Sequence, residues 1–347
     1  MSVKSIVAAF MFWWIFSQPV WSQKIYGPIR DVESTEKFLP EFPKFQYHGI
    51  ILGYENLKYR PHDDICFVSV FPAYKHFDRP LGKYYMYYAA HDGPGICLAY
   101  ADHITGPWTE YESNPLFDNV WEPYYKVSHT SSPDVCWIQG ESKLFLYFHG
   151  ENDVTRYATS TDGIRFSYGG EAVNLWKHGL GTSSYSRVQR FSMPDDSSRY
   201  IMFTMGTHNR TNPVGTREIY LSTSVDGRTW KSNPEPLLPF PPGTDQMGPG
   251  CYLHWENRHF LIMMANLTGT DYQPVSNIYL YEVDEKLQNP RLQGVLLDRG
   301  VLDPEHSRFS SPGILVEDGK IHLFFTIGGR LNEKAGYAVA KLNENQK

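Results

Sequence analysis

The sequence contains only four cysteines in 347 residues, and they are scattered along the chain. No CxxC or HxxxH spacing indicates a zinc site, and four thiols are too few for a disulfide scaffold in a chain of this length. Runs rich in lysine and arginine are also missing, and the formal net charge is −6. A mildly acidic surface of this kind argues against nucleic acid or anionic lipid as the partner.

Long apolar runs are missing beyond the N-terminus, so no membrane span is predicted. Lys4 precedes an apolar run over residues 6–16, which is too short to cross a bilayer and is followed by a polar stretch ending at Ser22. This pattern predicts a secretory signal peptide over residues 1–22 and a secreted or periplasmic protein; the alternative is a buried N-terminal helix. Residues 23–46 are then an N-terminal extension.

Helical periodicity is missing over any stretch longer than about ten residues. No glycine-rich motif follows a strand and opens a helix, so no nucleotide cofactor is implied. Hydrophobic residues nevertheless make up 41% of the chain and aromatic residues 15%, which is enough to bury a sizeable core. The sequence therefore predicts a folded all-β protein.

A repeat of about sixty residues is the main feature that the sequence does contain. Each copy is marked by a short strand of bulky residues, such as Tyr84–Tyr88, and the centres of successive copies lie 56 to 61 residues apart. A more apolar strand precedes each of these strands and another follows it. Asp-Gly turns, such as Asp162-Gly163, suit the tight hairpins that must connect them. The five centres are Met86, Leu146, Met202, Ile262 and Leu323.

Five four-stranded units in a row predict a five-bladed β-propeller. The last unit lacks a fourth strand before the chain ends, and residues 47–52 form a spare strand that is well placed to complete it. We therefore expect a catalytic domain over residues 47–347, closed by this N-terminal strand. A pair of β-sandwiches is the alternative, but it would not predict so regular a period.

The first strand of each unit begins with different polar residues, although the units otherwise repeat. In a propeller these strands line the central channel, so charges of both signs near one axis indicate a ligand site. Loops after the second strands, such as His91-Asp92, add further polar groups. When the five strands are aligned by their neighbouring residues, the shared position holds Asp64, Asp134, Arg187, Gly250 and Gly313.

Ser132-Pro-Asp-Val135, followed by residues 143–148, resembles the second blade of family-43 glycoside hydrolases, the arabinanase and β-xylosidase type. Asp64-Ile65 and residues 82–88 are similar to the first blade of that family. The resemblance covers about residues 47–342 and implies a glycosidase acting on a plant or algal polysaccharide or its oligosaccharides. It implies no organic cofactor, and a Ca²⁺ ion in the central channel would fit it. The sequence assigns no metal ligands and predicts no oligomeric state.

Carried over by position, the resemblance makes Asp64 the general base and Asp134 the carboxylate that tunes the acid, in an inverting mechanism. Residues 183–187 contain no counterpart of the acid glutamate of the family. His129 is therefore a third catalytic candidate, and the other candidates for the acid are Glu151, Asp245 and Glu305. The residues predicted to contact the substrate are His62, Asp63, Tyr185, Arg187, Asp245, His306 and Arg308.

Two other functions stay open. A polysaccharide lyase removes the proton beside a uronate carboxylate, which requires a neutralising arginine or cation and a histidine or tyrosine base. Arg187 or Arg308 could neutralise the carboxylate, and His129 or Tyr185 could act as the base. The third possibility is a propeller that binds carbohydrate without catalysis. The missing glutamate favours both alternatives, whereas the two aligned aspartates favour hydrolysis.

Overall fold

The computed structural model describes residues 30–31, 39, 41–207, 216–270 and 273–342. The predicted signal peptide lies outside the described residues, as does most of the predicted extension. Strands dominate the described part, which also contains the short helix α1 (Arg299–Leu302) and the 3-10 turns Tyr54–Asn56, Ala73–Lys75 and Leu175–His178. None of its helices is long and apolar enough to cross a membrane.

The strands pair with their neighbours in sequence to form antiparallel sheets. The first sheet contains β3 (Cys66–Phe71), β4 (Tyr84–Ala89), β5 (Gly95–Ala101) and β6 (Thr109–Glu110), with β7 (Phe117–Asp118) beside β5. The small hairpin of β8 (Val120–Trp121) and β9 (Tyr125–Lys126) follows it. The second sheet contains β10 (Ser131–Ile138), β11 (Lys143–Gly150), β12 (Val154–Ser160) and β13 (Ser167–Val173). The third contains β14 (Ser184–Arg190), β15 (Tyr200–Thr207), β16 (Arg217–Ser224) and β17 (Lys231–Pro236).

The remaining strands form one nine-stranded sheet made of two runs. The first run is β18 (Thr244–Trp255), β19 (Arg258–Leu267), β20 (Ser276–Val283) and β21 (Arg291–Leu297). The second is β22 (Arg308–Glu317), β23 (Lys320–Gly329), β24 (Asn332–Lys341), β2 (Phe45–Leu52) and β1 (Arg30–Asp31). A single parallel residue pair, Ser276 with Arg308, joins the two runs. The predicted spare strand is β2, which starts at Phe45 rather than Tyr47 and pairs antiparallel with β24.

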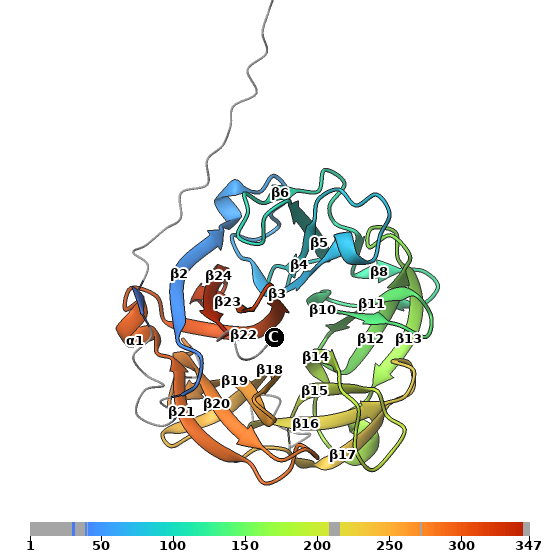
Figure 1. Ribbon diagram of the computed structural model, residues 1–347. Helices are drawn as coiled ribbons and strands as arrows, with labels where there is room; N and C mark the ends of the chain where they lie inside the picture. Colours follow the sequence, from blue (N-terminus) through green and yellow to red (C-terminus); the bar gives the residue numbers. More distant parts are fainter. Residues whose placement is uncertain (1–29, 32–38, 40, 208–215, 271–272, 343–347) are drawn as a thin grey trace, which may run out of the picture.

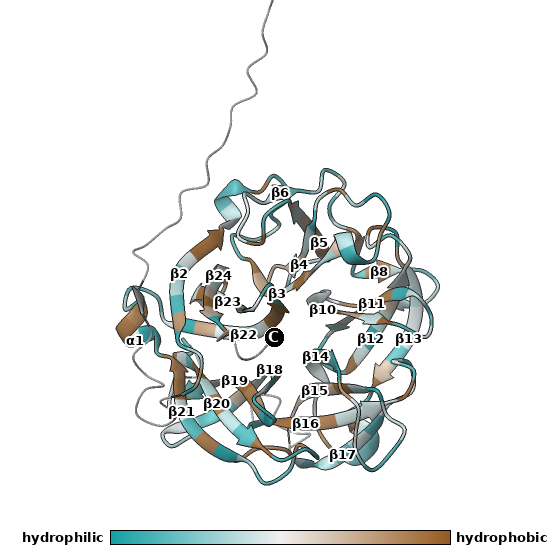
Figure 2. Cartoon of the chain, viewed as in Figure 1, coloured by the Kyte–Doolittle hydropathy of each residue, from teal (hydrophilic) through white to brown (hydrophobic). Residues whose placement is uncertain are grey.

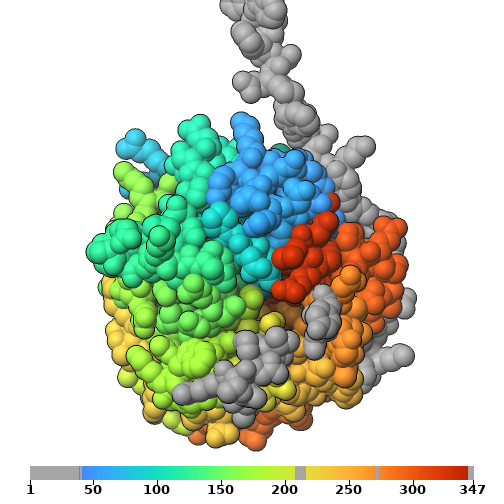
Figure 3. All heavy atoms as spheres, turned by 180° about the vertical axis from the view of Figure 1, so that it is seen from behind, coloured from blue at the N-terminus to red at the C-terminus, as the bar shows by residue number. Residues whose placement is uncertain are grey.

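The sheets are arranged around a common centre, with β3, β10, β14, β18 and β22 nearest to it (Figure 1). This is the arrangement of a β-propeller, as the sequence predicts. In the space-filling view the last strands, in red, lie against the first repeat, in blue and cyan (Figure 3). The first and last parts of the chain are therefore neighbours, and the inner strands of all the repeats meet at one place.

Apolar side chains of adjacent sheets pack against each other between the sheets. Tyr85 and Tyr87 of β4, for example, belong to the same buried cluster as Leu144 and Leu146 of β11. The middle strands are bulky at every position because alternate side chains point to opposite faces of a sheet and both faces are covered. Hydrophobic residues accordingly lie along the strands, whereas the outer loops are mostly hydrophilic (Figure 2).

Candidate active site

All five inner strands contain a β-bulge at the same place. The pairing with the next strand shifts between Cys66 and Ser69 in β3, and the other four inner strands shift at the matching point. The residue after the start of the bulge has a positive φ in four strands, which non-glycine residues rarely adopt. These residues are Phe67 (φ 54°), Ser132 (56°), Tyr185 (57°) and Ser311 (53°). Because a bulge redirects side chains, it gives the inner strands a common set of positions facing the centre.

The bulges also correct the alignment made from the sequence. The residues that resume regular pairing after the bulge are Ser69, Asp134, Arg187, Cys251 and Gly313. The predicted equivalence of Asp134, Arg187 and Gly313 is therefore confirmed. The predicted equivalence of Asp64 with Asp134 is wrong, because Ser69 occupies that position in β3. Asp64 lies two residues before the bulge, as do His129 and Arg308 in their own repeats. The predicted place of Gly250 is also wrong, by one residue, because Cys251 occupies the shared position in β18.

Asp134 and Arg187 form a buried ion pair near the centre, beside a small cavity of about 90 Å³. Arg187 Nη1 donates to Asp134 Oδ1 at 3.0 Å, Ser69 Oγ donates to the same oxygen at 2.8 Å, and the Val188 N–H donates to Oδ2 at 2.6 Å. Burial raises the pKa of Asp134, and the Arg187 guanidinium opposes this shift. The predicted tuning carboxylate and the predicted substrate contact are thus bonded to each other.

A central Ca²⁺ ion does not fit this arrangement. Calcium takes six to eight oxygen ligands, whereas the central carboxylate of Asp134 is already neutralised by the Arg187 guanidinium. A second positive charge beside that guanidinium would be repelled. Asp134 is therefore not a suitable ligand for the cation that the family resemblance allows.

Asp64 bridges the first and last repeats. Its Oδ2 accepts a hydrogen bond from the His91 N–H at 2.7 Å, and its Oδ1 accepts one from the Glu333 N–H at 2.6 Å. The Ile65 N–H in turn donates to the Glu333 carbonyl at 2.8 Å. Burial, with Glu333 nearby, raises the pKa of Asp64 to about 7. These contacts hold the loop that carries His91 in a fixed place.

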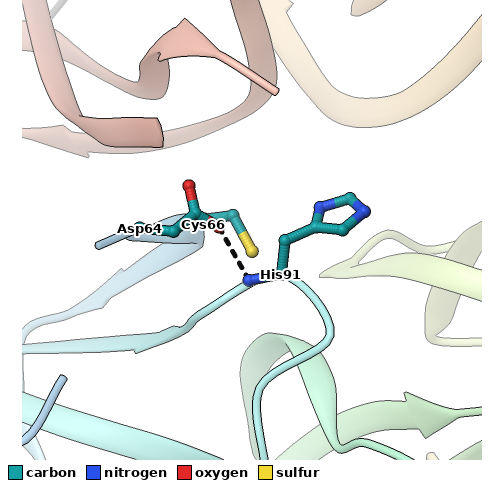
Figure 4. A group of neighbouring side chains, drawn as sticks. All are labelled: Asp64, Cys66 and His91. Atoms are coloured by element: carbon teal, nitrogen blue, oxygen red, sulfur yellow. Dashed lines mark hydrogen bonds between the residues drawn. The ribbon is translucent and has the colours of Figure 1, made fainter. Parts of the chain in front are cut away.

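Asp64, Cys66 and His91 are the one group of three potential metal ligands within the described ranges, with ligand atoms within 4.8 Å of one another. Both Asp64 oxygens, however, already accept backbone hydrogen bonds, and the His91 imidazole turns away from that contact (Figure 4). Burial raises the pKa of the Cys66 thiol well above its usual value, so the sulfur stays protonated. The donor set does not suit Ca²⁺, which prefers oxygen.

We expect the elevated pKa of Asp64 to make folding stability depend on pH. Because the pKa rises from 3.8 to about 7 on folding, the protonated form favours the folded state. Its contribution is full below about pH 4 and is lost as the pH rises through 7. The free energy of unfolding of the wild type, relative to Asp64→Asn, should therefore fall by more than about 1.4 kcal/mol from pH 4 to pH 8, the equivalent of one pKa unit. Urea unfolding at several pH values measures this.

The neighbouring Asp63 provides the control, because its side chain is 65% exposed. Asp63→Asn should follow the wild type at every pH. Parallel pH profiles for the wild type and Asp64→Asn would show instead that Asp64 keeps an ordinary pKa.

A larger cavity of about 310 Å³ opens above the bulges. Its walls come from the inner strands and from the loops that follow the second strands of the repeats. Its apolar and small lining residues are Phe67, Met205, Met247, Gly248, Pro249, Met264 and Pro274. Its polar lining residues are His91, Asp92, Asn152, Tyr185, Arg217, Gln246, Asn266, Arg308, Ser311 and Arg330. Four bulge positions, those of Phe67, Tyr185, Pro249 and Ser311, belong to this lining.

Phe67 and Tyr185 of the lining belong to a row of aromatic rings that continues to His149 and His129 outside the lining. The Tyr185 ring lies 4.7 Å from the Phe67 ring and 4.7 Å from the His149 ring, measured between centroids, and His149 meets His129 edge to face at 5.6 Å. Burial lowers the pKa of His91 to about 4 and that of His149 well below its usual value. Burial also raises the pKa of Tyr185. At neutral pH the cavity therefore presents neutral imidazole and a protonated phenol.

Only two of the predicted site residues, Tyr185 and Arg308, line the larger cavity. Asp64, Asp134 and Arg187 lie beneath it in the contacts described above, and His129 is buried with its Nδ1 bonded to Ser128 Oγ at 2.9 Å. The other predicted contacts and acids lie outside the lining, and all of them are in loops except Asp245, which lies in β18. His62, Asp63 and Glu305 are exposed. Asp245 Oδ2 accepts a hydrogen bond from the Gly269 N–H at 3.4 Å, and Glu151 accepts one from the Ser128 N–H at 3.1 Å. His306 is hydrogen-bonded to Asp303 at 2.8 Å.

Arg217 and Arg330 are not among the predicted site residues, and His91 and Asp92 were predicted only as polar loop residues. Arg217 starts β16, and Arg330 follows β23. Each lies at the same end of its sheet as the bulges, because adjacent antiparallel strands run in opposite directions. Their positions in the repeat, at the start of a third strand and after the end of a second strand, could therefore have identified them as site residues.

Comparisons with known proteins show a likeness of fold. No family model and no curated protein matches the chain. An α-L-arabinofuranosidase from Lactobacillus brevis matches with a TM-score of 0.59 at 14% identity, over 82% of this chain and 93% of its own. One from Podospora anserina, in complex with cellotriose, matches with a TM-score of 0.57 at 12% identity, over 84% and 94%. An N-acetylgalactosamine deacetylase from F. plautii matches with a TM-score of 0.57 at 13% identity, over 84% and 95%.

The predicted resemblance to propeller glycosidases of the arabinanase type is thereby confirmed as a likeness of fold. The same fold also carries the deacetylase, so the fold alone does not decide the reaction. The reaction has to be argued from the residues of the cavity.

Proposed function

We propose that this chain is a secreted or periplasmic glycoside hydrolase that cleaves glycosidic bonds in a plant or algal polysaccharide or its oligosaccharides. The proposal takes residues 47–347 as a five-bladed propeller closed by β2. The observation that carries it is the 310 Å³ cavity at the shared bulges, which combines aromatic rings with a few convergent polar groups, as sugar-binding sites do. The likeness of fold to two arabinofuranosidases supports it.

Inverting hydrolysis needs a base to activate water and an acid to protonate the leaving oxygen. Asp92 is exposed and is the one carboxylate among the described residues of the cavity lining, so we assign the base to Asp92 instead of Asp64. Tyr185 keeps its proton because burial raises its pKa, and it is the group in the lining best placed to donate to the leaving oxygen. Asp64 is then a positioning residue, since it accepts from the His91 N–H next to Asp92.

The cavity also favours a second candidate, a polysaccharide lyase. Hydrolysis by two carboxylates finds no second acid in the described part of the lining, where Asp92 is the one acidic residue. Elimination instead needs a neutral base, and the low pKa of His91 leaves its imidazole free to accept a proton at neutral pH. Tyr185 could return a proton to the leaving oxygen in this reaction as well.

The identity of the products separates the two reactions. The purified protein is incubated with a panel of neutral, uronic and sulfated polysaccharides and their oligosaccharides, while new reducing ends and the ultraviolet absorbance of unsaturated uronates are followed together. We expect reducing ends to form without absorbance. A proportional rise in absorbance would establish elimination, and binding to a substrate without either product would indicate a carbohydrate-binding propeller.

A further inference from the structure

Three arginines from different parts of the chain line the same cavity. Arg217 starts β16, Arg308 starts β22, and Arg330 lies in the turn between β23 and β24. Asp92 is the one acidic residue in the lining, so the described wall carries two net positive charges, while the whole chain carries −6. Such a concentration of positive charge in a concave site attracts anionic ligands.

Two of these arginines have buried nitrogen atoms without hydrogen-bond partners. Arg308 is 7% exposed, and its Nε has no partner among the described residues. The Nε of Arg217 is also buried and has none there. Guanidinium nitrogens are donors only, and buried donors in folded proteins nearly always have an acceptor. The missing acceptors are therefore expected to come from a ligand.

Arg308 is held in place by a buried ion pair with Glu333. Its Nη1 lies 2.9 Å from Oε1 of Glu333, which is 1% exposed and also accepts from Ser310 Oγ at 3.2 Å and Thr326 Oγ1 at 3.1 Å. Arg217 and Arg330, in contrast, form no ion pair within the part of the chain that is described. One guanidinium is thus fixed in place, and two are free to close on a bound group.

The three guanidiniums line one cavity together with His91 and Tyr185. Each contributes to the low pKa of His91, and Arg217 and Arg308 both act on Tyr185. A group bound between the arginines would therefore lie next to the residues that we assign to proton transfer.

We propose that Arg217, Arg308 and Arg330 bind an anionic substituent of the sugar, a carboxylate or a sulfate ester. This inference rests on the proposed function only in taking the ligand to be a carbohydrate. The planar fork of a guanidinium matches two oxygens of either group. A neutral sugar offers only hydroxyl and ether oxygens, which accept weaker hydrogen bonds than a charged oxygen, so the site should discriminate against it.

Direct binding tests this without any cleavage. Isothermal titration with D-galacturonate, D-galactose 6-sulfate and neutral D-galactose should show at least one anionic sugar binding about tenfold tighter than galactose. Arg217→Gln and Arg330→Gln should each weaken the anionic sugar about three- to tenfold and leave galactose unchanged. Arg165→Gln is the matched control, because the Arg165 side chain is 89% exposed and belongs to a turn outside the cavity.

The anion that binds identifies the source of the charge: preference for galacturonate indicates a uronic acid, and preference for the sulfate indicates a sulfate ester. Equal affinity for all three sugars, or affinity that is insensitive to both arginine variants, would overturn the inference. Anion binding without cleavage of any panel substrate would leave the subsite intact and count against the proposed enzyme. Cleavage of neutral glycans alone would support the proposed enzyme and count against the anion subsite. Thermal unfolding of each variant confirms that it is folded.

Discussion

Replacement of Arg187 by methionine is expected to lower the free energy of unfolding by about 3–5 kcal/mol. Arg187 and Asp134 are 4% and 7% exposed, and the variant would leave the Asp134 carboxylate buried without its counter-charge. The loss should be large because the pair joins the inner strands β3, β10, β14 and β22. Arg187 Nη2 also donates to the Ser311 carbonyl at 2.8 Å, and Asp134 accepts from β3 and β14.

Urea unfolding of the wild type and the variant measures the difference, with an exposed arginine as the control. Arg165→Met should cost less than about 0.5 kcal/mol, as surface substitutions usually do. The double variant Asp134→Asn with Arg187→Met should recover part of the loss, since it removes both charges. A cost below about 1 kcal/mol for Arg187→Met would mean that Asp134 does not need its partner.

Asp92→Asn is expected to lower the rate of cleavage about 10²- to 10⁴-fold, the range for loss of a general base. An amide has the shape of the carboxylate but cannot accept a proton from water. Because Asp92 is exposed, the variant should unfold at the temperature of the wild type. Steady-state rates on the panel substrate that gives the most product measure the change.

The matched control is Asp195→Asn, because Asp195 is also an exposed acid, 65% accessible, and pairs with Lys286 away from the cavity. Its rate should equal that of the wild type. Tyr185→Phe should lower the rate of either reaction, because Tyr185 donates to the leaving oxygen in both, whereas Asp92 acts only in hydrolysis. Near-normal cleavage by Asp92→Asn, together with a loss of at least about 100-fold in Tyr185→Phe, would remove the base from Asp92 and favour elimination.

The propeller could be predicted from the sequence because short runs of bulky side chains recur at a regular spacing. The middle strands are covered on both faces, so their bulky residues form a signal at regular intervals, and Tyr85, Tyr147 and Phe260 are fully buried as that signal requires. The boundary of β2 differed by two residues from the prediction because strand ends carry little pattern.

The site was harder to predict because a bulge changes the register without changing the composition. Asp64-Ile65 and Asp134-Val135 look alike as sequence, yet one lies before a bulge and the other after it. Tyr185 and Arg308 could be predicted as site residues because they lie at the starts of inner strands, which surround the centre. Arg217 and Arg330 were missed because the route of the loops next to them depends on tertiary contacts that the sequence does not display.

The pairing of β2 with β24 has a consequence for the order of folding. Tyr47 lies opposite Ala338, so the contact joins residues separated by nearly the whole chain. During synthesis β2 can pair only with the short strand β1 until the final repeat is available, whereas each internal sheet can form from about forty to sixty consecutive residues. Until then both β2 and β24 are unpaired edges, which are the parts of a β-protein most prone to associate with other chains. Assembly should therefore proceed repeat by repeat and finish with the N-terminal strand.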